Sequence, residues 1–130
     1  MTRLLLDTHA LLWFLFDDPR LSTRAAQLIE DTQVDKVLSV ASLWEITIKL
    51  QLGKLELGMP LDTFFSDFVR GRELRLLPIE LPHLLAYSAL PLHHRDPFDR
   101  LLIAQAKTLR MPILTSDESF TRYEVETLWR

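Results

Sequence analysis

The feature that most constrains the fold is a series of short, mainly apolar runs, of which the first is uninterrupted. Residues 4–6 stop at Asp7, residues 37–40 follow later, and residues 112–115 end just before Asp117. Such a run is typical of a strand buried on both faces of a parallel sheet. Segments with helical periodicity separate the runs. This alternation predicts an α/β fold with a mostly parallel central sheet.

Further segments complete the expected sheet and its covering helices. Residues 74–79 predict another strand, and residues 125–129 predict a strand at an edge. With the runs above, this gives a sheet of about four to five strands. Helical patterns occupy residues 10–16, 22–32, 60–70, 82–90 and a stretch that begins at Asp96. The helix at 22–32 is expected to begin at Ser22 as its cap.

The segment 42–52 fits two structures. Its apolar and polar residues alternate, which is the period of a strand. Against this, Ser42 and Glu45 form a capping-box pattern, and Glu45 and Lys49 are spaced as a favourable helical ion pair. A strand so soon after the second apolar run would also need a tight turn that the sequence does not offer. We therefore predict a helix.

The helix beginning at Asp96 has an unusually well specified first turn. Asp96 is suited to the N-cap, and Pro97 then occupies the first helical position, where a missing N–H costs nothing. Asp99 follows in the first turn, where the helix N-terminus stabilises a negative charge. A role at the helix start is therefore sufficient to explain Asp99 taken by itself.

Composition limits the classes of function. The chain has 130 residues, the size of one domain, and 48% of them are hydrophobic and 25% charged, as in globular proteins. The absence of cysteine excludes disulfides, thiolate metal sites and a cysteine nucleophile. The net charge of −3 gives no broad basic field, so nucleic-acid binding must use local patches.

The apolar start of the chain is not a membrane segment. Residues 4–16 are too few to cross a bilayer, and Asp7 and His9 interrupt them. No small-residue cleavage site follows, which argues against a signal peptide. We therefore expect a cytoplasmic protein without a membrane partner.

Four acidic residues are expected at one edge of the sheet, where sites in open α/β sheets form. They are Asp7, Glu45, Asp99 and Asp117. Each one alone is explained as a cap, an ion-pair partner or a turn residue. Together, ionised carboxylates at one edge repel each other unless a cation neutralises them. Oxygen ligands without cysteine indicate Mg²⁺ or Mn²⁺.

Four motifs, in order along the chain, resemble the PIN-domain family. They are LLDTHALLW at 5–13, SLWEI at 42–46, DPFDRLLIAQA at 96–106 and LTSD at 114–117. The likeness is closest to the VapC-like ribonuclease toxins of bacterial toxin–antitoxin pairs, and it spans nearly the whole chain. It implies a single PIN-like nuclease domain at 1–130, folded as a three-layer α/β/α sandwich. It also implies a helix at 42–52.

The resemblance assigns roles to the acidic residues. It implies that Asp7, Glu45, Asp99 and Asp117 are the family's acidic quartet, catalytic residues that also bind one or two Mg²⁺ or Mn²⁺ ions. Water bound there would act as hydroxide on an RNA phosphodiester, which makes the chain an endoribonuclease. Asp7 and Asp99 are the best direct ligands. The extra carboxylate of this motif, Asp96, is expected to cap its helix.

Two further sets of residues are candidates for supporting roles. The hydroxyls suited to hydrogen-bond a ligand or a phosphate oxygen are those of Thr8, Thr115 and Ser116. The candidates for cationic contacts with the RNA backbone are Lys49, Arg95 and Arg100. For these cations, pairing with nearby surface carboxylates is an equally good interpretation.

The resemblance also implies partners. VapC-like toxins are homodimers and are held inactive by a cognate antitoxin, whose other end binds operator DNA. The apolar helix at 10–16, with Trp13 and Phe14, adds modest support for a homodimer. The alternative is that this helix lies between the sheet and neighbouring helices.

Three other functions fit part of the pattern. A receiver-type phosphoacceptor domain needs an adjacent acidic pair after the first strand, where Asp7 stands alone. A dehalogenase-like, Mg-dependent phosphohydrolase needs two aspartates flanking one residue, which His9 prevents. A catalytically inactive PIN-like binding or scaffold protein is the third, although all four acids are present.

Overall fold

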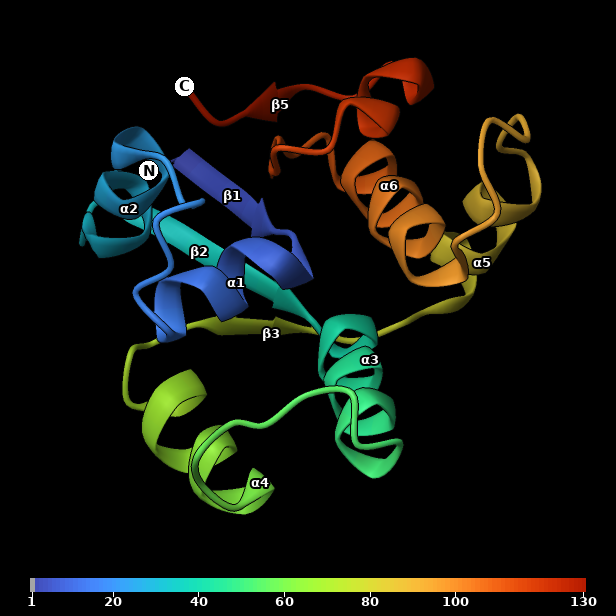
Figure 1. Ribbon diagram of the computed structural model, residues 1–130. Helices are drawn as coiled ribbons and strands as arrows, with labels where there is room; N and C mark the ends of the chain where they lie inside the picture. The colour runs from blue at the N-terminus through green and yellow to red at the C-terminus, as the bar shows by residue number, and fades with distance from the viewer. Residues whose placement is uncertain (1) are drawn as a thin grey trace.

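Five parallel strands form the centre of the molecule. The structure is a computed structural model and describes residues 2–130. The strands are β1 (Thr2–Leu6), β2 (Val34–Ser39), β3 (Arg75–Leu77), β4 (Ile113–Leu114) and β5 (Thr127–Leu128), in the order β3-β2-β1-β4-β5 (Figure 1). Every pairing between them is parallel. The predicted parallel sheet is confirmed, although β3 and β5 are shorter than the runs that predicted them.

Helices cover both faces of this sheet. They are α1 (Thr8–Leu15), α2 (Thr23–Glu30), α3 (Val40–Gln51), α4 (Leu61–Thr63), the π-helix η1 (Phe64–Arg70), α5 (Leu81–Ser88), α6 (Pro97–Leu109) and the 3₁₀-helix η2 (Glu118–Tyr123). Buried residues of α1, α2, α3 and η1 form one core, and those of α6 and η2 form another. This is the expected three-layer sandwich. Within residues 2–130, no helix combines the length and the apolarity that a membrane span requires.

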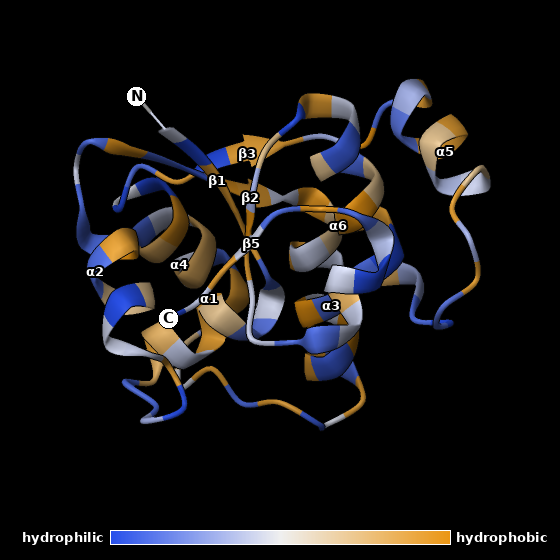
Figure 2. Ribbon diagram, turned by 90° about the horizontal axis from the view of Figure 1, so that it is seen from above, coloured by the Kyte–Doolittle hydropathy of each residue, from blue (hydrophilic) through white to orange (hydrophobic). Residues whose placement is uncertain are grey.

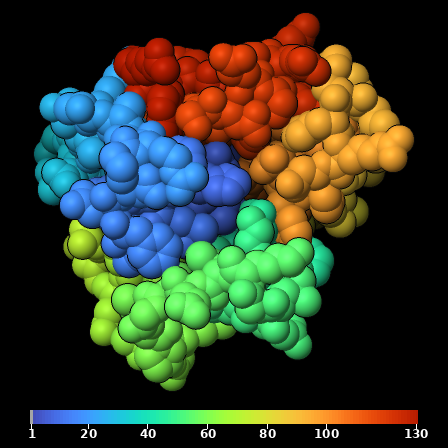
Figure 3. All heavy atoms as spheres, in the orientation of Figure 1, coloured from blue at the N-terminus to red at the C-terminus, as the bar shows by residue number. Residues whose placement is uncertain are grey.

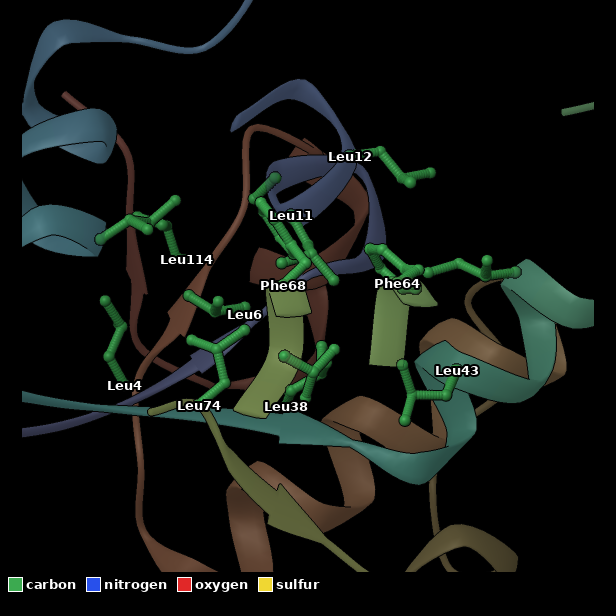
Figure 4. Packing of buried hydrophobic residues seen from close by; sticks show 14 of the residues in the cluster. Leu4, Leu6, Leu11, Leu12, Leu38, Leu43, Phe64, Phe68, Leu74 and Leu114 are labelled. Carbon is green, nitrogen blue, oxygen red and sulfur yellow. The ribbon is translucent and has the colours of Figure 1, made fainter. Parts of the chain in front are cut away.

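The apolar run of β1 fills both cores because successive side chains of a strand point to opposite faces. Leu4 and Leu6 belong to the first core, together with Leu38 of β2 (Figure 4). Leu5 belongs to the second core, together with Ile103 of α6. These side chains are at most 1% exposed. A central parallel strand needs apolar residues on both faces, which explains why the run is uninterrupted.

Two helices begin at the caps that the sequence predicts. The Ser22 hydroxyl accepts the N–H of Ala25 at 3.0 Å and starts α2. One carboxylate oxygen of Asp96 accepts the N–H groups of Phe98 at 2.9 Å and Asp99 at 3.1 Å, which starts α6. Both interactions satisfy backbone donors that have no partner inside the helix.

The segment 42–52 lies in α3, so the predicted helix is confirmed, but its predicted start is wrong. The cap is Ser39, whose hydroxyl accepts the N–H of Ala41 at 3.0 Å. Ser42 is instead completely buried inside the helix. Glu45 therefore lies in the second turn of α3.

The segment 60–70 combines a short α-helical turn with a π-helix. This arrangement stacks the rings of Phe64 and Phe68, whose centroids lie 5.4 Å apart at an interplanar angle of 15°. Gly71 ends the π-helix. A Cβ at this position would stand 2.3 Å from the carbonyl oxygen of Asp67, so only glycine fits the close approach of the backbone.

The apolar helix α1 lies inside the molecule. Leu11 and Leu12 are buried, and Phe14 packs against the first core. Only at the C-cap does a large apolar side chain, Phe16, become exposed, at 44%. The chain's own elements thus cover this helix, which favours the second of the two sequence interpretations.

Replacing Ser22 by alanine tests two hydrogen bonds of its hydroxyl, the cap of α2 and a bond to the C-terminal segment. The hydroxyl also donates to the carbonyl oxygen of Trp129. Loss of the cap and of this bond should lower the free energy of unfolding by about 1–2 kcal/mol in urea titrations. The control Thr23→Ala changes an exposed neighbour and should cost less than about 0.5 kcal/mol. Equal stability of S22A and wild type would contradict this role.

Candidate functional site

The carboxyl edge of the sheet has a topological switch point between β1 and β4. The strand order runs β3-β2-β1 on one side and β4-β5 on the other, and ligands of open α/β sheets bind in the crevice at such a point. Asp7 directly follows β1, and Asp117 follows β4. The segments α1 (blue), α3 (green) and α6 (orange) meet near the middle of the face shown in Figure 3.

Asp7 is held in place by the neighbouring strand. Its N–H donates to the carbonyl of Leu114 at 3.1 Å, and the Thr115 hydroxyl donates to its Oδ2 at 2.8 Å. The side chain is 4% exposed, and its Oδ1 is buried without a hydrogen-bond partner. Burial raises the pKa of Asp7 and the Glu45 carboxylate raises it further, against the opposing hydrogen bond from Thr115.

Glu45 faces the same edge from α3. Its Oε2 lies 3.1 Å from Nζ of Lys49 one turn later, which is the ion pair that the spacing predicts. Its Oε1 is buried and has no hydrogen-bond partner. The Lys49 ammonium is therefore engaged by a carboxylate of the site itself.

Asp99 lies in the first turn of α6, where its Oδ2 is 3.6 Å from Nε2 of His94. Burial is the main cause that raises the pKa of Asp99 to about 8. The remaining causes are the negative charges of Asp96, Asp7, Glu45 and Asp117. All of these carboxylates therefore lie within electrostatic range of Asp99.

Asp117 is exposed and serves as the cap of η2. Its Oδ1 accepts the N–H of Ser119 at 2.9 Å and the hydroxyl of the same residue at 2.8 Å. Its own N–H donates to the Thr115 hydroxyl at 3.1 Å. The same hydroxyl donates to Asp7, so Thr115 links the two acidic residues that flank the switch point.

The structure brings the four predicted acidic residues to one edge without closing them into a ligand set. Within residues 2–130, no three His, Asp or Glu side chains are placed to hold a metal ion. The donors still fit a hard cation, because all are oxygens and because Oδ1 of Asp7 and Oε1 of Glu45 are buried and unpartnered, which is costly.

The supporting hydroxyls differ in their surroundings. Thr8 is buried and donates to the Ser42 hydroxyl at 2.8 Å, which joins the start of α1 to α3. Thr115 is buried between the two aspartates, whereas Ser116 is exposed beside Asp117. Thr8 and Thr115 thus orient neighbouring residues, and Ser116 is the hydroxyl that solvent reaches.

Arg100 is a buried residue, which contradicts its predicted contact with the RNA backbone. It is 5% exposed, and its Nη1 donates to the carbonyl of Pro91 at 2.9 Å and to the Tyr123 hydroxyl at 3.1 Å. Its guanidinium also stacks 5.0 Å from the ring centroid of Tyr87. Arg100 therefore fastens the loop before α6. Of the other two predicted cations, Lys49 pairs with its carboxylate and Arg95 is exposed.

The sequence interpretation missed His94. Its Nδ1 lies 2.7 Å from the Tyr123 hydroxyl, and its Nε2 faces Asp99. These contacts depend on the loop before α6 folding back on η2, which is far along the chain. No spacing or motif signals such a contact, so only the tertiary structure reveals it.

The fold and the acidic residues at the carboxyl edge of the sheet define the class of the protein. It is an α/β/α sandwich with acidic residues at the topological switch point. The family model "PIN domain" matches residues 4–126, and the chain therefore belongs to the PIN domain family. PIN domains are generally nucleases, which supports a hydrolase acting on nucleic acid. The resemblance drawn from the four motifs is thus confirmed at the level of the family.

Solved structures share the fold over nearly the whole chain. VapBC2 from Rickettsia felis, bound to a DNA fragment from its promoter, matches with a TM-score of 0.74 and 14% identity over 99% of this chain and 100% of the matched chain. FitAcB from Neisseria gonorrhoeae matches at 0.67 and 20% over 96% of each chain. FitAB bound to an IR36 DNA fragment matches at 0.63 and 20% over 96% and 93%. No curated protein matches the sequence.

The crowding of carboxylates predicts a stability that falls as pH rises. In the unfolded chain Asp99 ionises near pH 4, whereas in the folded chain its pKa is about 8. The folded state therefore binds more protons between these values, and metal-free protein loses stability across this range. Asp99→Asn should raise the melting temperature in EDTA at pH 8 by on the order of 5 °C and by little at pH 4.

Differential scanning fluorimetry across this pH range measures the effect. Glu56→Gln removes a carboxylate that is exposed and distant in sequence from the site, so it serves as the control. A D99N protein with the same pH profile as wild type would show that repulsion at this edge is small.

Proposed function

We propose that this protein is a metal-dependent endoribonuclease that acts as the toxin of a toxin–antitoxin pair. The observation that carries the proposal is the gathering of Asp7, Glu45, Asp99 and Asp117 at the switch point of the sheet. They come from four distant segments, and two of their oxygens are buried without partners. Stability alone does not favour such a group, because each added charge raises the cost of ionising the others. A cation and a phosphodiester substrate explain it.

The four carboxylates are the proposed ligands of Mg²⁺ or Mn²⁺. A bound ion of this kind stabilises charge on phosphoryl oxygens and lowers the pKa of coordinated water. The chain's own residues prepare the edge for it. Thr115 holds Oδ2 of Asp7 and leaves its Oδ1 without a partner, and Lys49 pairs with Oε2 of Glu45 and leaves its Oε1 without a partner.

Two exposed groups are the proposed first contacts of an RNA phosphate at this edge. Arg95 lies one residue before the cap of α6, and Ser116 lies one residue before Asp117. An arginine offers paired N–H donors to a phosphate, and a hydroxyl offers one more. Both residues are exposed, so a polymeric substrate can reach them.

A cognate antitoxin is the proposed inhibitor. The similar structures include VapBC2 bound to promoter DNA and FitAB bound to a DNA fragment, which are complexes of more than one protein. By this likeness, we propose that an antitoxin covers the acidic edge and that operator DNA is bound through the antitoxin. Such a system works in the cytoplasm, where a nuclease toxin meets its RNA.

A second copy of the chain is proposed to cover an apolar surface on α5 and α3. Four large exposed apolar side chains lie on these two helices: Trp44 at 57%, Leu81 at 68%, Leu84 at 51% and Leu85 at 63%. In Figure 2, α5 stands at the edge of the molecule and carries hydrophobic residues. Contiguous exposed apolar groups of this kind mark an interface, and a homodimer is the simplest occupant.

RNA cleavage by the purified chain tests the nuclease. Cleavage should require Mg²⁺ or Mn²⁺ and should stop in EDTA. Asp7→Asn and Asp99→Asn each remove a proposed ligand and should lower the rate by about 100-fold or more, which corresponds to about 3 kcal/mol of lost transition-state stabilisation. Glu56→Gln should cleave like wild type.

Two results would separate this function from its alternatives. Cleavage that survives in both aspartate variants would show that the carboxylate assignment is wrong. A folded wild type that leaves every RNA intact at all metal concentrations, yet binds a protein partner tightly, would instead identify an inactive PIN-like binding protein.

Light scattering after gel filtration tests the homodimer. Leu84→Lys places a charge in the proposed apolar surface, so it should shift the chain from dimer to monomer at micromolar concentration. Leu76→Lys is the matched control, since Leu76 is 42% exposed on β3, outside this surface. Monomeric wild-type protein would refute the assignment, as would an unchanged dimer in L84K.

A further inference from the structure

The hydroxyl of Tyr123 is a buried junction between η2 and the loop before α6. Tyr123 is the last residue of η2 and is 1% exposed. Its hydroxyl accepts the backbone N–H of His94 at 3.0 Å and an N–H of the Arg100 guanidinium at 3.1 Å. It also lies 2.7 Å from Nδ1 of the His94 ring. Three hydrogen bonds therefore meet at one oxygen atom, which is the full capacity of a hydroxyl.

The hydrogen bonds at this junction determine which ring nitrogen of His94 carries the proton. A hydroxyl has one hydrogen to donate and two lone pairs that accept. The backbone N–H and the guanidinium only donate, so they occupy both lone pairs of the Tyr123 oxygen. The hydroxyl hydrogen is then left for Nδ1 of His94, which accepts it. In a neutral imidazole the other nitrogen is the donor, so the proton of His94 lies on Nε2.

Nε2 of His94 lies next to the acidic edge, 3.6 Å from Oδ2 of Asp99 in the first turn of α6. Within residues 2–130 this nitrogen is buried without a hydrogen-bond partner, and a buried N–H without an acceptor is costly. Hydrogen bonds of active sites are often long in the ligand-free state and shorten in the complex. The Asp99 carboxylate is thus the acceptor available to the His94 N–H.

The other three acids of this edge already have one oxygen held by a neighbouring residue. A side-chain donor is supplied by Thr115 for Asp7, by Lys49 for Glu45 and by Ser119 for Asp117. A carboxylate that is held through one oxygen keeps its second oxygen for a ligand, and its fixed orientation lowers the cost of binding. His94 would complete this arrangement for Asp99.

We propose that His94 is a positioning residue of the acidic site and holds Asp99 through its Nε2–H. The Nε2–H donates to Oδ2 of Asp99, and Tyr123 keeps the imidazole in the tautomer that makes this donation possible. Oδ1 of Asp99 then remains for a divalent ion. The role rests on the proposed nuclease function, and it makes that site depend on η2 and on the loop before α6.

A purely structural role for His94 makes the opposite demand on the ring. If His94 only anchors the loop before α6, its Nδ1 contact with Tyr123 is needed and its Nε2–H is not. Two amide side chains separate these roles, because asparagine places a polar atom near the position of Nδ1 and glutamine places one near that of Nε2. H94N therefore keeps an acceptor for Tyr123 and loses the donor to Asp99, whereas H94Q keeps a donor to Asp99.

Binding of Mn²⁺ to the RNA-free chain, followed by electron paramagnetic resonance of the free ion, tests this role apart from activity. His94→Asn should raise the Kd for Mn²⁺ about 10-fold, and His94→Gln should recover most of the loss. In RNA cleavage at a fixed, subsaturating Mn²⁺ concentration, kcat of H94N should fall about 10-fold while KM for RNA stays within about twofold. His93→Asn is the matched control, since His93 is exposed and lies edge-on to the Tyr123 ring.

Nitrogen-15 NMR of histidine-labelled wild-type protein in EDTA tests the tautomer without any variant. At about pH 8, where an ordinary imidazole is neutral, Nε2 of His94 should give the signal of a protonated nitrogen and Nδ1 that of an unprotonated one. The His94 signals are those that disappear in either variant. Melting temperatures show whether the variants fold, and the tautomer together with H94Q decides the proposal if H94N does not.

The outcomes separate the positioning role from the nuclease itself. Wild-type protein that cleaves RNA with Mn²⁺, matched by H94N in Mn²⁺ affinity and kcat, overturns the positioning role and leaves the nuclease intact. A loss in H94Q that H94N does not share assigns His94 to the loop anchor alone. A His94 proton found on Nδ1 also overturns the role. Wild-type protein that neither binds Mn²⁺ nor cleaves any RNA overturns the proposed function, and the positioning role with it.

Discussion

The main constraint on this structure is the mutual repulsion of the carboxylates that gather at the carboxyl ends of its central strands. Asp99 shows the size of this constraint, because burial and four neighbouring acids raise its pKa to about 8. Single hydrogen bonds and one ion pair to selected carboxylate oxygens offset part of this repulsion. Thr115 occupies one oxygen of Asp7, and Lys49 occupies one of Glu45. The unpaired oxygens that remain are a source of instability in the free chain, and they are the atoms that the proposed function assigns to a cation.

The central position of β1 explains why these acids meet. β1 pairs with β2 on one side and with β4 on the other, so it stands next to the point where the strand order reverses. Its apolar residues serve both cores, which leaves Asp7 as the first polar side chain beyond the buried run. The same geometry makes Thr115 of β4's end a direct neighbour of Asp7. Fold stability and site position therefore follow from one strand.

Sequence patterns predict the parts of this molecule that local physics determines. The short apolar runs predict the parallel sheet, because burial on both faces of a strand requires neighbouring apolar residues. Ser22 and Asp96 act as the predicted caps, because capping depends only on the residues at the start of a helix. The predicted start of α3 is wrong by a few residues. Ser39 and Ser42 both suit a cap, and the burial of Ser42 against Thr8 leaves Ser39 as the cap. The positions of the Arg100 and His94 side chains depend on contacts with Tyr123, which lies far along the chain. No local sequence pattern predicts such a contact.

Electrostatics also constrains how the acidic edge would admit the substrate of the proposed nuclease. In the proposed function, an RNA phosphate approaches an edge that carries four carboxyl groups, on a chain whose net charge is −3. Neutralising the carboxylates and admitting the phosphate are therefore one electrostatic problem, which a divalent cation solves for both.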